Sequence, residues 1–117
     1  MFSGTVIHAD KIARTRGYPT ANLNVTPQEI KMPEGVYAAW AYLDGKKYPG
    51  SLVLIDRFNK VEIHLIGYTG DDLYGKTLAI EPVKKVSNIE VLDEGPLRRK
   101  IADDVRIVKE FLLGNTG

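Results

Sequence analysis

The sequence predicts a mainly β protein, a small antiparallel barrel or sandwich that ends in one α-helix. Two observations predict this fold class. Short runs rich in β-branched and aromatic residues, punctuated by Gly, Pro and Asp, dominate the first two thirds of the chain. From Pro96 onward, apolar residues recur with the helical period instead. With 117 residues, 44% hydrophobic and 26% charged, we expect a single domain over residues 1–117.

Five runs are expected to be strands. They cover residues 3–8, 36–43, 47–55, 60–66 and 77–86. The pair Asp44-Gly45 between the second and third runs favours a type I′ hairpin, because both central residues of that turn need positive φ. We therefore expect these two strands to be neighbours.

Between the first two strands lies a long polar segment, residues 9–34, which is too rich in Gly and Pro to be one regular element. Within it, Thr26, Pro27 and Glu29 fit the N-cap, N1 and N3 positions of one helical turn, and Pro33 would end that turn. Long loops within compact domains are usually functional, so this segment is a candidate for ligand binding.

The last part of the chain predicts an amphipathic helix. Pro96 suits its first turn and Gly114 suits the position after its end. The basic run 98–100 is expected on its solvated face, with Asp103 and Asp104 within i, i+4 reach. The apolar stripe should cover one side or end of the barrel; it consists of Leu97, Ile101, Val105, Val108 and Leu112.

Composition excludes several classes of protein and site. Sixteen Lys and Arg against fifteen Asp and Glu leave a net charge of +1, so we expect neither nucleic acid nor membrane as a partner. Without cysteine the chain has no disulfide, thiolate zinc site or cysteine nucleophile, which fits a reducing compartment. The N-terminus lacks a signal-peptide pattern, and no stretch approaches the roughly 20 apolar residues of a spanning helix. We expect a cytoplasmic protein.

Residues 70–77 match the phosphate-binding pattern G-x-x-x-x-G-K-[ST] letter for letter. A P-loop holds phosphate because it turns directly into a helix whose N-terminal N–H groups point at the anion. Here Thr77 begins a run with strand character that meets Pro82. We therefore interpret the match as a coincidence.

Thr20 and Asn22 are candidate metal ligands. Pro19 favours an extended chain around it, and in an extended chain Thr20 and Asn22 lie on one side. A hydroxyl and an amide oxygen are neutral ligands that Mg²⁺ accepts when phosphate oxygens and waters complete its shell. Local turn or cap hydrogen bonds are the alternative, and the spacing alone favours them because both residue types are common in loops.

Glu62 is a candidate general base. In the fourth predicted strand it shares with His64 the face opposite the apolar one, and a carboxylate there can accept a proton from a substrate hydroxyl. The alternative is a solvated glutamate on the outer barrel face. A zinc site at His64 is not expected, because the only other histidine is His8 and zinc sites generally need three or four protein ligands.

These segments resemble the riboflavin kinase (flavokinase) family, which also forms the C-terminal module of bifunctional bacterial FAD synthetases. The specific parts are G-[FY]-P-T-A-N at residues 17–22 and E-x-H at residues 62–64. The resemblance covers nearly the whole chain, in stretches 4–8, 14–23, 33–38, 61–65, 72–76 and the L-x-x-x-I-x-x-D pattern of 97–104.

The resemblance implies a six-stranded antiparallel Greek-key β-barrel with a C-terminal α-helix. It implies transfer of the γ-phosphate of ATP to the ribityl 5′-hydroxyl of riboflavin, giving FMN and ADP. Thr20 and Asn22 would hold Mg²⁺, or Zn²⁺ or Mn²⁺ in its place, and Glu62 would be the base. Lys84 or Lys85 would replace an arginine that helps to hold the flavin. The implied nucleotide-binding residues are Gly4, Val6, Lys11, Arg14, Gly17, Pro19, Leu65 and Tyr74.

The expected partners are therefore riboflavin and a nucleoside triphosphate, and we expect the domain to act alone as a monomer. Two alternatives stay open, because Ala9 and Ala13 stand where the family commonly has glycines in its phosphate loop. One is a flavin- or nucleotide-binding sensor module of the same fold with weak catalysis. The other is a kinase that uses another nucleoside triphosphate.

Overall fold

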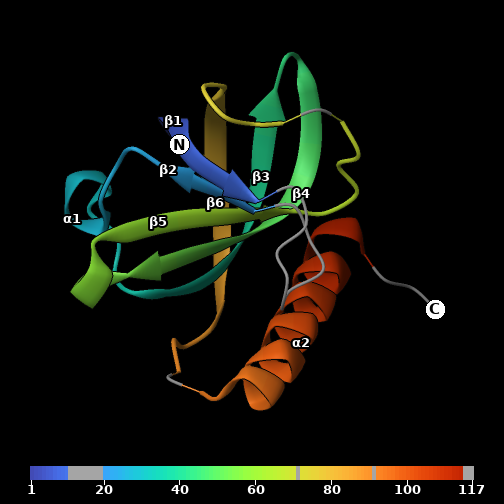
Figure 1. The fold of residues 1–117 in the computed structure, drawn as a ribbon. Helices are drawn as coiled ribbons and strands as arrows, with labels where there is room; N and C mark the ends of the chain where they lie inside the picture. Colours follow the sequence, from blue (N-terminus) through green and yellow to red (C-terminus); the bar gives the residue numbers. More distant parts are fainter. Residues whose placement is uncertain (11–19, 71, 91, 115–117) are drawn as a thin grey trace.

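The chain folds into a closed β-barrel with a long helix against its outside (Figure 1). The structure, a computed structural model, describes residues 1–10, 20–70, 72–90 and 92–114. Its elements are, in chain order, β1 (Phe2–Asp10), β2 (Thr20–Leu23), α1 (Pro27–Ile30), β3 (Gly35–Leu43), β4 (Lys46–Ile55), the 3₁₀ turn η1 (Asp56–Phe58), β5 (Lys60–Leu65), β6 (Thr77–Ser87) and α2 (Glu94–Leu113).

The six strands follow one another around the barrel in the order β1-β2-β5-β4-β3-β6, and every neighbouring pair is antiparallel. β3, β4 and β5 form a meander, and β6 returns to lie beside β3, which is the Greek-key arrangement. Pairing of β1 with β6 closes the barrel. The fold class predicted for this sequence is confirmed.

Local signals in the sequence account for two of the connections. Asp44 and Gly45 both have positive φ, at 49° and 80°, and β3 and β4 pair along their length on either side of them. Around α1, Thr26 Oγ1 accepts from the Glu29 N–H at 3.2 Å, and Glu29 Oε1 accepts from the Thr26 N–H at 2.9 Å. The predicted hairpin and the predicted capping box are both confirmed.

The pattern-based prediction of five strands missed β2, which lies inside the segment expected to be a long loop. β2 has four residues, too few for an alternating pattern to stand out from its surroundings. Only the family resemblance, with its six strands, implied it.

The P-loop pattern of residues 70–77 has no helix after it. Thr77 begins β6, and Gly75 has a φ of 80° in the turn before that strand. The Gly75 N–H donates to the Val6 carbonyl at 2.9 Å, and the Val6 N–H donates to the Lys76 carbonyl at 2.8 Å. These backbone groups extend the barrel, so the interpretation of the match as a coincidence is confirmed; Asp71 lies outside the described residues.

Two apolar clusters stabilise the fold. The larger fills the barrel with inward side chains such as Leu52, Ile63 and Leu78, each 0% exposed. The smaller joins α2 to the outside of the barrel and consists of Ala38, Ile66, Val105 and Val108.

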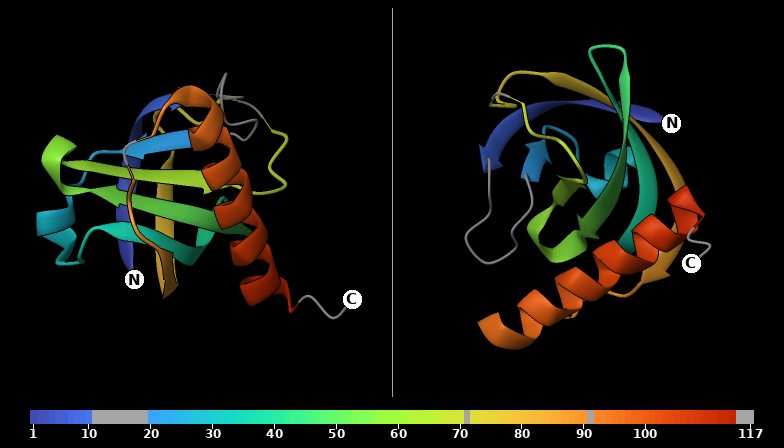
Figure 2. Two further views of the ribbon diagram at one scale, coloured as in Figure 1. Left: turned by 90° about the horizontal axis from the view of Figure 1, so that it is seen from below. Right: turned by 90° about the vertical axis from the view of Figure 1, so that its right-hand side faces the viewer.

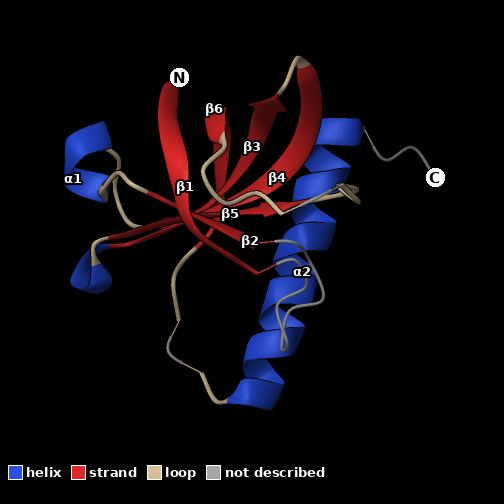
Figure 3. Cartoon of the chain, turned by 45° about the horizontal axis from the view of Figure 1, so that its top comes forward, coloured by secondary structure: helices blue, strands red, loops and turns tan. Residues whose placement is uncertain are grey.

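α2 runs diagonally across the outer face (Figure 2), where it contacts β3, β4 and β6. It lies on the opposite side of the barrel from α1 (Figure 3). Its C-cap is Gly114, with a φ of 62°, as the sequence predicts, and Pro96 lies in its first turn. In the described part of the chain, no helix has the length and apolar character needed to span a bilayer.

Candidate active site

A band of polar side chains crosses the outside of the barrel over β2, β5 and β4. Thr20 of β2 and Ser51 of β4 lie opposite His64 of β5, and Asn22 lies opposite Glu62. Residues directly opposite one another in an antiparallel pair point to the same face of the sheet. The two predicted metal ligands and the predicted base therefore share one face, although about 40 residues separate them in sequence.

Glu62 and His64 are buried, each only 2% exposed. Glu62 Oε1 lies 3.0 Å from His64 Nε2, which is within hydrogen-bond distance. The alternative of a solvated glutamate on the outer face is therefore wrong. Strand alternation correctly predicted the face on which Glu62 and His64 lie. It could not predict that this face is buried, because part of the face borders α2, which lies far away in sequence.

Thr20 and Asn22 lie within the strand β2 rather than in a turn of the described residues. Asn22 Oδ1 is buried and has no hydrogen-bond partner among the described residues. An unsatisfied buried oxygen costs about 1–3 kcal/mol, so this atom is able to accept a hydrogen bond or to coordinate a cation.

The residues present fit a hard divalent cation of the kind that also takes phosphate oxygens. Within the described ranges, no three His, Asp or Glu side chains come close enough together to hold a metal. A neutral pair such as Thr20 and Asn22 suits a cation whose charge is balanced by a bound triphosphate.

A pocket opens beside Glu62, between α2 and the outside of β3 and β4. Its polar lining includes Glu62, His64, Lys100 and Asp104. Its apolar walls come from the barrel, α2 and the segment between them, and consist of Val36, Val53, Ile55, Ile89, Leu97 and Ile101. Apolar walls with a few converging polar groups are typical of small-molecule sites.

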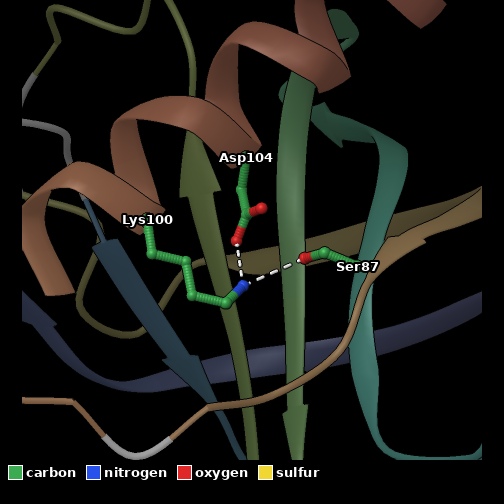
Figure 4. A network of polar contacts seen from close by, with 3 residues as sticks. All are labelled: Ser87, Lys100 and Asp104. Atoms are coloured by element: carbon green, nitrogen blue, oxygen red, sulfur yellow. Dashed lines mark hydrogen bonds and ion pairs between the residues drawn. The ribbon is translucent and has the colours of Figure 1, made fainter. Parts of the chain in front are cut away.

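Lys100 lines this pocket. Figure 4 shows its contacts with Asp104 and Ser87. Its ammonium donates to Asp104 Oδ2 at 2.7 Å and to Ser87 Oγ at 3.1 Å. The i, i+4 pairing predicted with Asp104 is confirmed, but the expected solvated position is wrong: the Lys100 side chain is 15% exposed and that of Asp104 is 9%. Lys100 precedes Ile101 at the border of the apolar stripe, whereas Arg98 and Arg99 are exposed as predicted.

A family model described as riboflavin kinase (Flavokinase) matches residues 1–112. The chain belongs to the riboflavin kinase family. A bifunctional riboflavin kinase/FMN adenylyltransferase of Mycoplasma pneumoniae is 30% identical over 97% of this chain and 43% of its own length. One of Escherichia coli K12 is 34% identical over 93% of this chain and 37% of its length. The chain thus spans about two fifths of these relatives.

Solved structures show the same fold. A riboflavin kinase from Trypanosoma brucei superposes with a TM-score of 0.71 at 20% identity, over 95% of this chain and 75% of its own. A structure from Streptococcus pneumoniae described as a macrolide-efflux protein also gives 0.71, at 21% identity, over 92% of this chain and 35% of its own. At these identities the likeness concerns the fold alone.

The nucleotide-binding residues predicted from the riboflavin kinase family lie in different settings. Gly4, Val6 and Leu65 are buried in the barrel, whereas Tyr74 is 69% exposed in the turn before β6. A nucleotide role for these four stays a prediction. The other four, Lys11, Arg14, Gly17 and Pro19, lie outside the described residues.

Lys84 and Lys85, predicted to hold the flavin, are exposed on β6 and do not line the pocket beside Glu62. Lys84 Nζ lies 5.4 Å from the centroid of the Phe111 ring at the end of α2. Among the described residues, the Lys or Arg that lines this pocket is Lys100, which was predicted to lie on the solvated face of the helix. The signal that could have found it is its position beside the apolar stripe of α2.

Proposed function

We propose that this chain is a riboflavin kinase, which transfers the γ-phosphate of ATP to the ribityl 5′-hydroxyl of riboflavin and releases FMN and ADP. The observation that carries the proposal is the position of Glu62. Its carboxylate is buried, with Asn22 opposite it on one neighbouring strand and the apolar pocket under α2 on its other side. Metal, base and acceptor sites would then adjoin along one face, as in-line transfer requires.

Thr20 and Asn22 are the residues proposed to hold the divalent ion, Mg²⁺ with Mn²⁺ or Zn²⁺ as alternatives. When bound, the ion neutralises charge on the triphosphate. The unsatisfied Asn22 Oδ1 supports this role.

Glu62 is proposed to accept the proton of the 5′-hydroxyl while the hydroxyl oxygen forms its bond to the γ-phosphorus and the bond from that phosphorus to the bridging oxygen of ADP breaks. The 3.0 Å contact with His64 Nε2 fixes the orientation of the carboxylate. A base of this kind has to lie within hydrogen-bond reach of the hydroxyl, which riboflavin bound in the adjoining pocket would allow.

The pocket under α2 is proposed to take the flavin ring system. Its branched aliphatic walls match a flat, largely apolar ring. The ribityl chain would then extend toward Glu62. We also propose that the protein acts in the cytoplasm, which its lack of cysteine fits.

The test is to incubate the purified protein with riboflavin, Mg²⁺ and ATP, CTP or GTP in turn, and to separate the flavins by chromatography. We expect FMN with ATP, and none when EDTA removes the metal. FMN with CTP or GTP in preference would change the donor but keep the reaction. Quenched riboflavin fluorescence without FMN formation would show that the chain is a flavin-binding module rather than a kinase. If neither quenching nor FMN is seen, the chain shares only the fold of the family.

A further inference from the structure

Lys100 is the one basic side chain, Lys or Arg, among the described residues that line the pocket under α2. The other ionisable groups there are the carboxylates of Glu62, Glu90 and Asp104, and His64. A cation at an apolar wall is unfavourable unless it is paired, and Asp104 pairs it. The pocket therefore presents one fixed positive charge.

The contacts of Lys100 fix the position of its ammonium but do not saturate it. An ammonium has three N–H donors and no acceptor. Asp104 Oδ2 at 2.7 Å and Ser87 Oγ at 3.1 Å take two of them, from α2 and from the end of β6. Within the described part of the chain, the third donor is available to a molecule in the pocket.

The ligand chemistry that fits this arrangement is a flat apolar body with hydrogen-bond acceptors on one edge. Leu97 and Ile101, on the same helix as Lys100, supply apolar wall in the same pocket. The isoalloxazine ring of a flavin has this chemistry: its benzenoid end is apolar, and its pyrimidine end carries two carbonyl oxygens and ring nitrogens. Charge beside the pyrimidine end is a recognised way for proteins to act on flavins.

We propose that Lys100 donates its third N–H to an acceptor on the pyrimidine edge of the flavin and is the specificity-determining residue of the acceptor pocket. Asp104 and Ser87 are its positioning partners. The contact fixes the ring in one orientation, which directs the ribityl chain toward Glu62. This inference rests on the proposed riboflavin kinase function. It assigns the basic side chain that contacts the flavin to Lys100 of α2 rather than to Lys84 or Lys85.

The first test compares Lys100→Met with Lys109→Met, an exposed lysine on the same helix. Riboflavin binding is measured by fluorescence quenching without nucleotide, and kcat and KM by FMN formation. We expect Lys100→Met to weaken riboflavin binding about 10-fold or more, the size expected for a hydrogen bond from a charged group. The KM for ATP should stay within about twofold, and Lys109→Met should match the wild type.

A second test separates recognition from a structural latch between α2 and β6. Sulfur is a weaker hydrogen-bond acceptor than oxygen, so 2-thioriboflavin or 4-thioriboflavin should bind the wild type more weakly than riboflavin does. In Lys100→Met this difference should disappear, while Lys100→Arg should keep it. A latch would instead weaken all three flavins equally and lower the melting temperature.

The outcomes are distinguishable. Equal binding by the Lys100 and Lys109 variants, or equal weakening of all three flavins, overturns the assignment of Lys100 and leaves the kinase proposal standing. If Lys100→Met does not fold, the wild type alone decides, because equal affinity for riboflavin and both thio analogues also overturns the assignment. A wild type that neither binds nor phosphorylates riboflavin overturns both proposals.

Discussion

Glu62 is the side chain whose substitution should separate chemistry from binding. Glu62→Gln keeps the shape but removes the proton acceptor, so turnover should fall by about 10²- to 10⁴-fold while riboflavin affinity changes little. Rates are measured by FMN formation and affinity by fluorescence quenching. Glu110→Gln, an exposed pair partner of Arg106 on α2, is the matched control and should retain wild-type rates. Near-normal turnover in Glu62→Gln would remove this residue from the mechanism.

At the same scale, the sequence predicted where side chains point better than how deeply they lie. Strand alternation put Glu62 and His64 on one face. The pairing register of β2 with β5 shows that Asn22 and Thr20 lie on the same face. Burial of that face could not be predicted, because its cover includes residues of α2, such as Leu97 and Ile101, that lie far away in the chain. Lys100 was misplaced for a related reason: helical periodicity defines the centre of an apolar stripe well and its border poorly.

α2 is the element that forms one wall of the pocket, and its attachment depends on few residues. Val108 is 0% exposed in the small cluster between α2 and the barrel. Val108→Ala should lower the free energy of unfolding by roughly 1–3 kcal/mol, from lost burial and the cavity left behind. Urea unfolding measures this free energy. The substitution Lys109→Ala, at the neighbouring exposed position, should change the free energy of unfolding by less than about 0.5 kcal/mol. Equal effects of Val108→Ala and Lys109→Ala would contradict the anchoring role of Val108.

Elements were predictable where a local rule specified them. The Asp44-Gly45 turn, the Thr26 capping box and the Gly114 end of α2 each depend on side chains or dihedral angles within a few residues. β2 is held instead by pairing with β1 and β5. Pairing partners that lie far apart in sequence leave no mark on a four-residue segment, so no local rule could identify it.

At the scale of the whole molecule, each of the six strands has two neighbours, because β1 and β6 close the barrel. A closed barrel presents no row of unpaired backbone groups to another copy. We therefore expect a monomer, and light scattering coupled to size exclusion should give a mass near 13.0 kDa. A mass near twice this value at micromolar concentration would show association through side-chain surfaces instead.

The closed topology itself was beyond the reach of periodicity. Patterns gave the class of fold and adjacency across one hairpin, whereas the strand order β1-β2-β5-β4-β3-β6 depends on contacts between distant segments. The family resemblance implied a six-stranded Greek-key barrel, because it applies to the chain as a unit, but it did not specify this strand order. The arrangement of the candidate site could not be predicted from periodicity either, because its residues come from β2, β5 and α2, which lie far apart in sequence.

The register that sets Asn22 opposite Glu62 also restricts how this domain can change its length during evolution. One residue inserted in β5 ahead of Glu62 would turn that carboxylate into the barrel interior and bring Ile63 outside. Insertions in this strand should therefore survive in pairs, or where a bulge absorbs the extra residue, as one does in β1 between Val6 and His8. Length variation among relatives should accumulate in loops and spare β2 and β5.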